Sequence, residues 1–314
     1  MPSSPRTVSI SGRLTIDMHS LNNEGGEGNQ IQTRMVHIVD GDGNLQVVNA
    51  ISGDMLKHIQ AEHLWSLAGT GNAALPLCDG CQKFSANRIN DDTAFFQDLG
   101  KASNEAIVTR VIQRCTMDDA EGILITRDNR SAPRKSTVEF GWAVGLPEKT
   151  RTEQYFHVKY VSERGAGSGD QSGANVGQNI FYRPANSGIY AVVSTVELHR
   201  VGWNDISREY VVDETTRRAR SKALLQSVLY TLVRMSGAQR NTQHPHVLGF
   251  EGVVSWSTTA TPAPTVSALA ADYQDQMVAI GQELNRLDAG AVTSERVSSS
   301  AELARVLADL VERI

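Results

Sequence analysis

The strongest constraint on the fold is an alternating stretch near the N-terminus that stops abruptly in a glycine-rich segment. From Val8 to Met18, apolar side chains fall mostly at even positions and polar ones lie between them. This period of two predicts a half-buried β-strand. Residues 19–29 are small, polar and rich in glycine, with one imidazole, His19. They offer N–H groups and amides to phosphate or ribose oxygens, and a solvent-exposed hairpin loop is the alternative interpretation.

The composition narrows the class of protein. The chain has 314 residues, 40% of them hydrophobic and 21% charged, which suits one large globular domain or two small ones. It contains neither an apolar run of the roughly 18 residues that span a membrane nor the apolar core of a signal peptide. Three cysteines, an odd number, do not suggest a disulfide framework. We therefore expect a cytoplasmic protein.

The charge distribution is polarised along the chain. The net charge of −5 does not by itself favour nucleic-acid binding, because such domains are usually basic. Residues 215–250 nevertheless contain six basic side chains and no acidic one, whereas residues 272–314 contain eight acidic and four basic ones. One face can therefore attract a polyanion, while the other can meet basic partners or keep the protein soluble.

The remaining pattern predicts an α+β fold. The expected elements are a helix from Ser52 or Asp54 to before Gly69, a helix over 104–114, strands over 121–126, 135–146, 155–163 and 179–201 with a turn at 184–188, a helix over 213–235, a strand over 248–256, a Thr/Ala/Pro linker over 258–266, and acidic amphipathic helices over 267–287 and 299–314. The glycine-rich stretch 164–178 reads as a mobile hairpin or lid. Without insertions the order is β-α-β-β-α-β, the ferredoxin-like or RRM topology.

A C-x-x-C pair suggests a metal site. Cys78 and Cys81 can present two sulfurs to one ion, and Cys115 offers a third. His63 is the predicted fourth ligand of a structural zinc site, with His58 as its substitute. The alternative is three unligated cysteines near a helix. A redox role is less favoured, because no thioredoxin-like βαβ pattern surrounds the pair.

Four segments together resemble a known family. They are SGRLTIDMHSLNNEGGEGN followed by Arg34 and MVHIVDGDG, then CTMDDAEGILIT, FYRPANSGIYAVVSTVELHRVG and HPHVLGFEG. In this order they resemble the DevR-type autoregulator group, the Cas-seven backbone subunits of type I CRISPR surveillance complexes (Cascade). The resemblance covers about residues 8–256, and the acidic tail does not contribute to it.

The resemblance implies a right-hand shape and a non-catalytic role in antiviral defence. The RRM-like palm would comprise residues 1–70 and 115–257, with inserted helical fingers at 71–134, a thumb hairpin at about 160–186, and a linker and acidic helices at 258–314. Several copies would line one CRISPR RNA, and the thumbs would kink it so that the remaining bases pair with target DNA. The implied partners are CRISPR RNA, target DNA, other copies of the chain, and the large, small and cap subunits of Cascade, without a membrane.

This role needs side chains that grip an RNA backbone, while sequence reading is left to base pairing. The glycine-rich segment, the start of the first helix and the basic helix near Arg217 supply such groups. The predicted RNA-binding residues are His19, Ser20, Asn22, Asn23, Asn29, Arg34, Ser52, Gly53, Arg88, Arg183, Arg217, Arg218, Arg220 and Lys222. Aromatic residues of the kind that stack bases on RRM sheets are not evident, so we expect no stacking on the sheet face.

Two other functions remain as alternatives. Type III backbone subunits resemble this family and cleave target RNA with a loop aspartate and a metal ion, but Asp40 and Asp42 lie in a plain DG turn. His244 and His246 flank a proline and favour a rigid turn over a metal pair. A free-standing RNA- or DNA-binding regulator would act as a monomer or dimer, whereas a backbone subunit would assemble along RNA.

Overall fold

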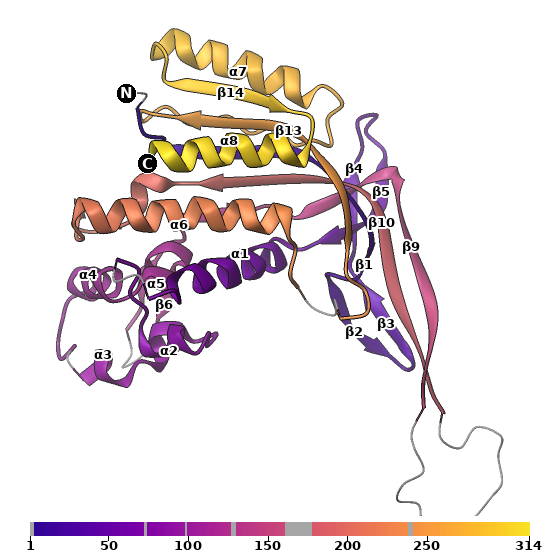
Figure 1. The fold of residues 1–314 in the computed structure, drawn as a ribbon, viewed down its shortest axis with the longest axis horizontal. Coiled ribbons are helices and arrows are strands. Elements are labelled where there is room, and N and C mark those ends of the chain that lie inside the picture. The colour runs from indigo at the N-terminus through magenta and orange to yellow at the C-terminus, as the bar shows by residue number, and fades with distance from the viewer. Residues whose placement is uncertain (1–2, 72–73, 98, 127–129, 161–177, 238–240) are drawn as a thin grey trace, which may run out of the picture.

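The computed structural model describes residues 3–314 except 72–73, 98, 127–129, 161–177 and 238–240 (Figure 1). The strands are β1 Thr7–His19, β2 Asn23–Glu27, β3 Gln30–Thr33, β4 Met35–Val39, β5 Leu45–Ile51, β6 Ile123–Ile125, β7 Ala132–Arg134, β8 Val138–Phe140, β9 Ala143–Tyr160, β10 Gln178–Val196, β11 Trp203–Asn204, β12 Glu209–Tyr210, β13 His246–Ser257 and β14 Val292–Val297. The α-helices are α1 Gly53–Ala68, α2 Asp79–Gln82, α3 Thr93–Gln97, α4 Asn104–Arg114, α5 Thr116–Glu121, α6 Glu214–Val233, α7 Tyr273–Leu287 and α8 Ser300–Arg313. The 3₁₀ helices η1 and η3 cover Arg88–Asp91 and Leu198–Arg200.

One large sheet organises the part of the chain that the structure describes. Seven of its ten strands follow the order β14-β13-β1-β10-β9-β5-β4, with β8 also paired to β10. The β2–β3 hairpin joins β10 through a parallel pairing of Gln30 with Tyr182. The other pairings are antiparallel. The result is a mixed fold of helices around a mainly antiparallel sheet, which agrees with the α+β part of the predicted fold class.

The central strand β1 shows why the alternating pattern was informative. Val8, Ile10, Leu14 and Ile16 are fully buried in the main core, whereas Met18 near the end of the strand is 43% exposed. Helices α8, α6 and α1 supply the other side of that core and are stacked in this order in Figure 1. The polar residues of β1 face the opposite side, where Arg13 donates from Nε to the carbonyl of Ala268 at 3.1 Å. The period of two therefore places the apolar side chains of β1 in the main core and its polar side chains on the other face of the sheet, which is also covered.

The two long helices begin where the sequence predicted. Ser52 is the N-cap of α1, and its Oγ accepts a hydrogen bond from the Met55 N–H at 3.2 Å. Asp213 caps α6 by accepting from the Thr216 N–H at 2.9 Å. A side chain at Gly53 would collide with the carbonyl oxygen of Phe140, so glycine lets α1 approach the sheet. Both caps satisfy N–H groups that would otherwise lack partners.

Two predicted irregular segments are in fact ordered strands. The turn expected at 184–188 is wrong, because β10 continues through it and the chain only shifts register between Gly188 and Tyr190. Gly188 has φ 147°, which accommodates this irregularity without a turn. The glycine-rich segment after β1 forms the β2–β3 hairpin, with residues 24–30 exposed, which agrees with the exposed-hairpin alternative. Most of the predicted lid 164–178 lies outside the described residues.

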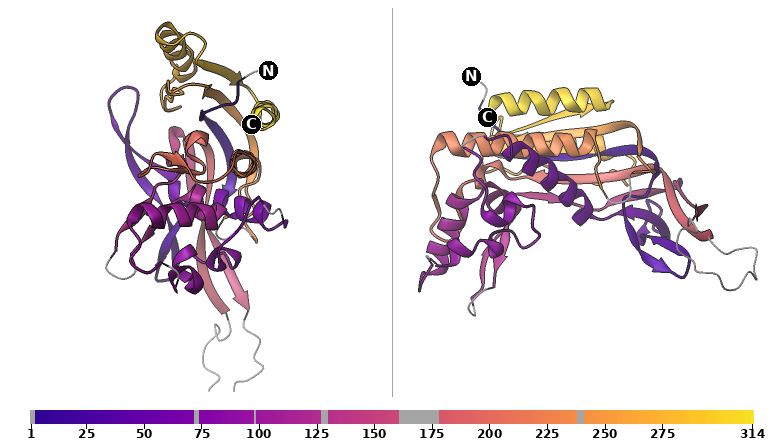
Figure 2. Two further views of the ribbon diagram at one scale, coloured as in Figure 1. Left: turned by 90° about the vertical axis from the view of Figure 1, so that its left-hand side faces the viewer. Right: turned by 60° about the horizontal axis from the view of Figure 1, so that its bottom comes forward.

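The C-terminal region packs on the sheet. Ala263 of the predicted linker, Ala268 and Tyr273 are buried against its second face. The helix predicted from residue 267 begins only at Tyr273, so Ala268 precedes it. The strand β14, which the sequence did not reveal, pairs with β13 and becomes an edge of the sheet. Figure 2 shows α7, β14 and α8 gathered at one end of the molecule, beside both chain termini. Among the described residues, none of the helices combines the length and apolarity needed to cross a membrane.

Candidate nucleic-acid interface and metal centre

The end of β1 is held by a buried hydrogen-bond network. His19 is 1% exposed, and its Nε2 lies 2.9 Å from the hydroxyl oxygen of Tyr190. Tyr190 in turn donates to Oδ1 of Asn49 at 2.8 Å, and Asn49 donates to Oγ1 of Thr33 at 3.1 Å. Burial lowers the pKa of His19 to about 3, so the imidazole is neutral at physiological pH. The network joins β1, β3, β5 and β10.

The same network accounts for other predicted RNA-binding residues. Asn22 accepts the backbone N–H of Ser52 through Oδ1 at 2.8 Å, which ties the segment after β1 to the start of α1. Ser20, Asn22 and Ser52 are all buried, as is Gly53. In this conformation these residues and His19 support the interior instead of facing solvent. The backbone of Asn23 begins β2.

Cationic groups that reach the surface lie near the β2–β3 hairpin and the β9–β10 arm. Arg34 pairs with Glu24, and its guanidinium lies 5.0 Å from the ring centroid of Trp142. Arg183 lies 4.7 Å from the ring centroid of Phe181. Asn29 is exposed, and its carbonyl accepts the Tyr182 N–H at 2.8 Å, which attaches the hairpin to β10. Sequence reasoning had named all three polar residues.

Aromatic side chains of the β9–β10 arm are a feature that sequence reasoning missed. The rings of His157 and Phe181 stack across the two strands at 5.5 Å, and those of Phe156 and Tyr182 meet edge-on at 5.8 Å. Phe156 is 56% exposed. Neighbouring residues of a strand point to opposite faces, so one ring pair lies on each face of the arm. The aromatic residues that form these pairs are visible in the sequence as QYFHV and NIFYR, but they belong to two separate strands.

The four predicted cations of α6 differ in their surroundings. Arg217 and Arg218 both pair with Glu214 near the surface, and Lys222 is exposed. Arg220 is 1% exposed, and its Nη1 donates to Oδ2 of Asp119 at 2.9 Å. The prediction that Arg220 faces RNA therefore disagrees with the structure, because its charge neutralises a buried carboxylate.

The predicted residues do not form one continuous site. The N-terminal end of α6 lies at the left of the molecule in Figure 1, whereas the β2–β3 hairpin and the β9–β10 arm lie at the right. Arg88 belongs to neither group. It starts η1 and donates to the carbonyl of Gly122. Arg34, Arg183 and Asn29 thus form one group, and the cations of α6 form another.

The acidic turn between β4 and β5 has a structural explanation. Oδ1 of Asp40 accepts the N–H groups of Asp42 and Asn44 at 3.0 and 2.8 Å, and Oδ2 accepts from Gln46 at 2.9 Å. These bonds, led by that from Gln46, lower the pKa of Asp40. The interpretation of this aspartate as a turn residue is confirmed.

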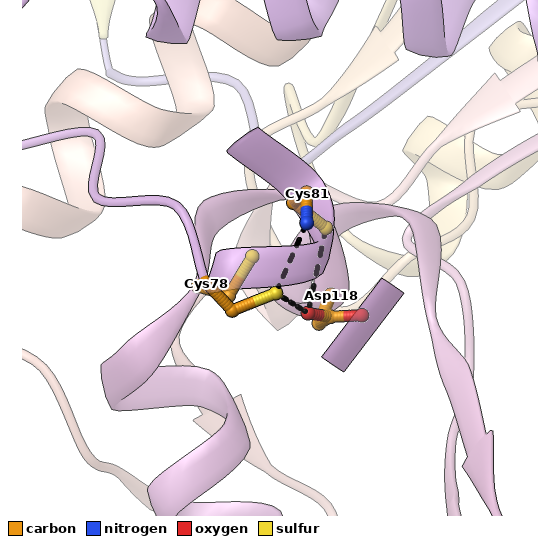
Figure 3. Close-up of side chains that lie close together, drawn as sticks. Cys78, Cys81 and Asp118 are labelled. Carbon is orange, nitrogen blue, oxygen red and sulfur yellow. Dashed lines mark hydrogen bonds between the residues drawn. The ribbon is translucent and has the colours of Figure 1, made fainter. Parts of the chain in front are cut away.

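The three cysteines meet in the interior. Cys78 is the N-cap of α2, Cys81 lies within α2, and Cys115 separates α4 from α5. Asp118 of α5 completes the group, and the four candidate ligand atoms of these residues lie within 4.8 Å of one another. The Cys78 thiol lies 3.3 Å from Oδ2 of Asp118, and the Cys81 thiol lies 3.7 Å from it (Figure 3). All four residues are buried.

The electrostatics of this group suit a cation. Hydrogen bonds from Cys115 and Cys81 lower the pKa of Cys78 to about 5, while burial raises the pKa of Cys115 and of Asp118. The pKa of Cys81 is also raised, mainly by its hydrogen bonds with the other two thiols. Oδ1 of Asp118 is buried and has no hydrogen-bond partner in the described part of the chain. A buried set of sulfur and carboxylate ligands with an unsatisfied oxygen could hold a metal ion.

The predicted histidine ligand lies elsewhere. Nε2 of His63 is 3.0 Å from the carbonyl oxygen of Arg234, and its ring packs edge-on against Tyr230. The suggested substitute His58 packs against Phe84 instead. Asp118 stands in the position expected of the fourth ligand, three residues after Cys115. That spacing within one helical turn was a signal that sequence reasoning did not use. His244 and His246 join no metal-ligating group among the described residues.

Comparison with known proteins connects this fold to CRISPR biology. No curated protein matches the chain. Among solved structures, a chain of a "CRISPR RNA-guided surveillance complex, pre-nicking" is 13% identical with a TM-score of 0.51, and the match covers 97% of this chain and 99% of that one. A "CRISPR RNA-guided surveillance complex" chain (13% identity, 98% of each chain, TM-score 0.48) and Thermofilum pendens Csc2 (13% identity, 98% of this chain and 86% of that one, TM-score 0.38) also match. The model of the family "CRISPR-associated negative auto-regulator DevR/Csa2" matches residues 10–278. The chain belongs to this family.

Proposed function

We propose that this protein is a non-catalytic backbone subunit of a type I CRISPR surveillance complex, that it binds CRISPR RNA, and that several copies assemble along one guide. The family match over residues 10–278 carries the proposal. Such a subunit holds the guide through its backbone and leaves the bases free to pair with target DNA. Its partners would then be the guide, the target DNA, further copies, and the large, small and cap subunits.

An RRM-like palm is supported by the connectivity of the central strands. β1 lies between β13 and β10, and β9 follows β10. Helix α1 lies in the chain between β1 and the β8–β9 region, with β2 to β5 inserted before it, and α6 lies between β10 and β13. This is the arrangement expected of a β-α-β-β-α-β unit. We assign residues 1–70 and 115–257 to this palm, and the last part, 258–314, to an appended C-terminal region.

The fingers and the thumb are assigned to the two long excursions from the palm. Residues 71–134 contain the short helices α2 to α5, and we assign them to the fingers, with boundaries that overlap the palm. The β9–β10 arm projects from the body in Figure 1 and would form the base of a thumb around 160–186. An RNA strand at this base would meet Arg34, Arg183 and Asn29.

We also propose that zinc occupies the cysteine centre as a structural ion. Cys78, Cys81, Cys115 and Asp118 would hold it, and the ion would supply charge neutralisation and cross-links between α2 and the start of α5. The short helix α2 has only four residues, too few to be stable without tertiary support. A metal would therefore fix the fingers in place without taking part in any reaction.

Assembly as a function of RNA length tests the proposal. Purified protein should be mixed with single-stranded RNAs of increasing length, and the particle mass measured by analytical ultracentrifugation. A backbone subunit should add copies stepwise as the RNA lengthens. A constant monomer or dimer on every RNA would instead favour a free-standing regulator. Loss of intact RNA in the presence of Mg²⁺ would favour a nuclease.

A further inference from the structure

A cavity of about 340 Å³ lies between α1 and the turn after α2. Its volume is near the lower end of the roughly 300–1,000 Å³ typical of small-molecule sites. Its apolar surface comes from Ala61, Phe84 and Met117, and Cys81 also lines it. Apolar and charged side chains line the cavity together, so it suits a ligand that has both an apolar ring and a charged group.

One wall is a single face of α1. Asp54, His58 and Ala61 all line the cavity, and their spacing of four and three residues places them on the same side of the helix. Asp54 and His58 are both exposed, and neither has a hydrogen-bond partner within the described residues. The wall therefore presents the carboxylate of Asp54 to a ligand, and the His58 ring beside it packs against Phe84 with ring centroids 5.7 Å apart.

The opposite wall combines an aromatic ring with a cation. Phe84 and Arg88 both have left-handed backbones, with φ of 52° and 50°, which non-glycine residues seldom adopt. Such conformations persist where the surroundings impose them, and they cluster at binding sites. Arg88 donates from Nη1 to the carbonyl of Gly122, and its charge also acts on the buried carboxylate of Asp118; Nε and Nη2 have no hydrogen-bond partner in the described part of the chain.

Lys57, the other cation of the cavity, is already engaged. Its Nζ donates to Ser136 and to the carbonyl of Val138, and it lies 3.0 Å from the buried carboxylate of Glu121. Two hydrogen bonds and this ion pair therefore engage the charge of Lys57 within the protein. Arg88 is therefore the cation left to bind an anionic part of the ligand.

We propose that this cavity binds one nucleotide of a single-stranded nucleic acid. The base would stack on Phe84, because aromatic rings bind unpaired bases by their faces. Arg88 would bind the phosphate, since guanidinium suits phosphate oxygens. The carboxylate of Asp54 accepts hydrogen bonds only, so it favours a base with an amino group, such as cytosine, over uracil.

The nucleotide could belong to the guide RNA or to target DNA, and only this attribution rests on the proposed function. Both sources present the same base and phosphate chemistry. Ultraviolet crosslinking of the assembled particle, followed by mass spectrometry of the peptide that contains residues 84–88, distinguishes them, because ribonucleotide and deoxyribonucleotide adducts differ in mass. Nucleotide binding by the isolated protein tests the cavity without any assembly.

The direct experiment is titration calorimetry of the full-length protein with CMP, UMP and cytidine. CMP should bind with one site per chain, about 3- to 10-fold more tightly than UMP because of one additional hydrogen bond. Phe84→Leu should weaken CMP binding about 5- to 150-fold, the range for loss of base stacking. Arg88→Gln should weaken CMP but leave cytidine unchanged. Asp54→Asn should remove the preference for CMP over UMP.

Phe96→Leu is the matched control, because Phe96 is also half-buried, lies in the nearby helix α3 and does not line the cavity. It should leave CMP binding unchanged. Melting curves identify any variant that fails to fold, and Arg88→Lys, which keeps the charge, should restore part of the binding. Absence of CMP binding, or binding that Phe84→Leu and Arg88→Gln both leave intact, would overturn the proposal. Loss of RNA-dependent assembly with intact CMP binding would refute the proposed function alone.

Discussion

Replacement of Asp119 by asparagine should destabilise the protein more than replacement of a surface carboxylate. Asp119 is fully buried and accepts hydrogen bonds from Arg134 at 2.8 Å, Arg220 at 2.9 Å and the Gly202 N–H at 3.0 Å. The side chains of both arginines are 1% exposed. Asp119→Asn keeps the shape of the side chain but leaves two adjacent guanidinium groups without their shared anion.

The magnitude follows from this geometry. Breaking a buried ion pair by removing one partner costs about 3–5 kcal/mol. Arg134 keeps a second carboxylate, Asp205 at 3.1 Å, which limits the cost on its side. Arg220 has no other acidic partner among the described residues, so its charge is left uncompensated. We therefore expect a loss of about 3–5 kcal/mol, a large part of the roughly 5–15 kcal/mol that stabilises a typical domain.

Urea unfolding followed by tryptophan fluorescence measures this loss. Glu214→Gln is the control, because Glu214 pairs with Arg217 and Arg218 at the surface, where ion pairs contribute about 0–1 kcal/mol. If Asp119→Asn and Glu214→Gln unfold at the same urea concentration, Asp119 does not neutralise the buried charges of Arg134 and Arg220. The structural role assigned to Arg220 would then be incorrect as well.

Three further predictions concern the RNA surface, the metal and pH. Arg34→Gln and Arg183→Gln should each weaken RNA binding equally for all RNA sequences. Each should also reduce the slope of log binding constant against log salt concentration by about 0.7, measured by fluorescence anisotropy. An unchanged slope would show that these residues do not contact RNA. Protein purified without chelators should contain about one zinc per chain by elemental analysis, and Cys115→Ser should lose it and melt earlier. Metal-free protein with normal melting would contradict the zinc assignment. Because the folded pKa of His19 is about 3 and the unfolded value is 6.5, the unfolded chain binds the extra proton between these values. Stability should therefore fall by up to about 1.4 kcal/mol per unit as pH drops through this window, and His19→Asn should abolish that part of the acid dependence.

Local sequence signals predicted the elements whose patterns are self-contained. The alternation in β1 and the caps Ser52 and Asp213 depend on near neighbours, so a single sequence shows them. The C-x-x-C pair likewise located the cysteine centre. The short strand β14 was missed, because six residues with charges in their middle carry little strand signal. Only its pairing with β13 defines it.

Other features depend on distant residues and could not be read locally. Arg220 looked like a surface cation, because its partner Asp119 lies 101 residues earlier in the chain. His19 looked like a loop ligand, because its partner Tyr190 lies 171 residues later. In both cases a polar side chain is buried only because tertiary structure supplies its partner. A charged or polar residue in a single sequence therefore indicates a site less reliably than an apolar pattern indicates a strand.

Native mass spectrometry of the protein co-expressed with its neighbouring operon genes tests the central claim most directly. The account predicts particles that contain several copies of this chain and one RNA of about the length of a CRISPR repeat plus spacer. A monomer or dimer free of nucleic acid would contradict the backbone role and favour a free-standing regulator.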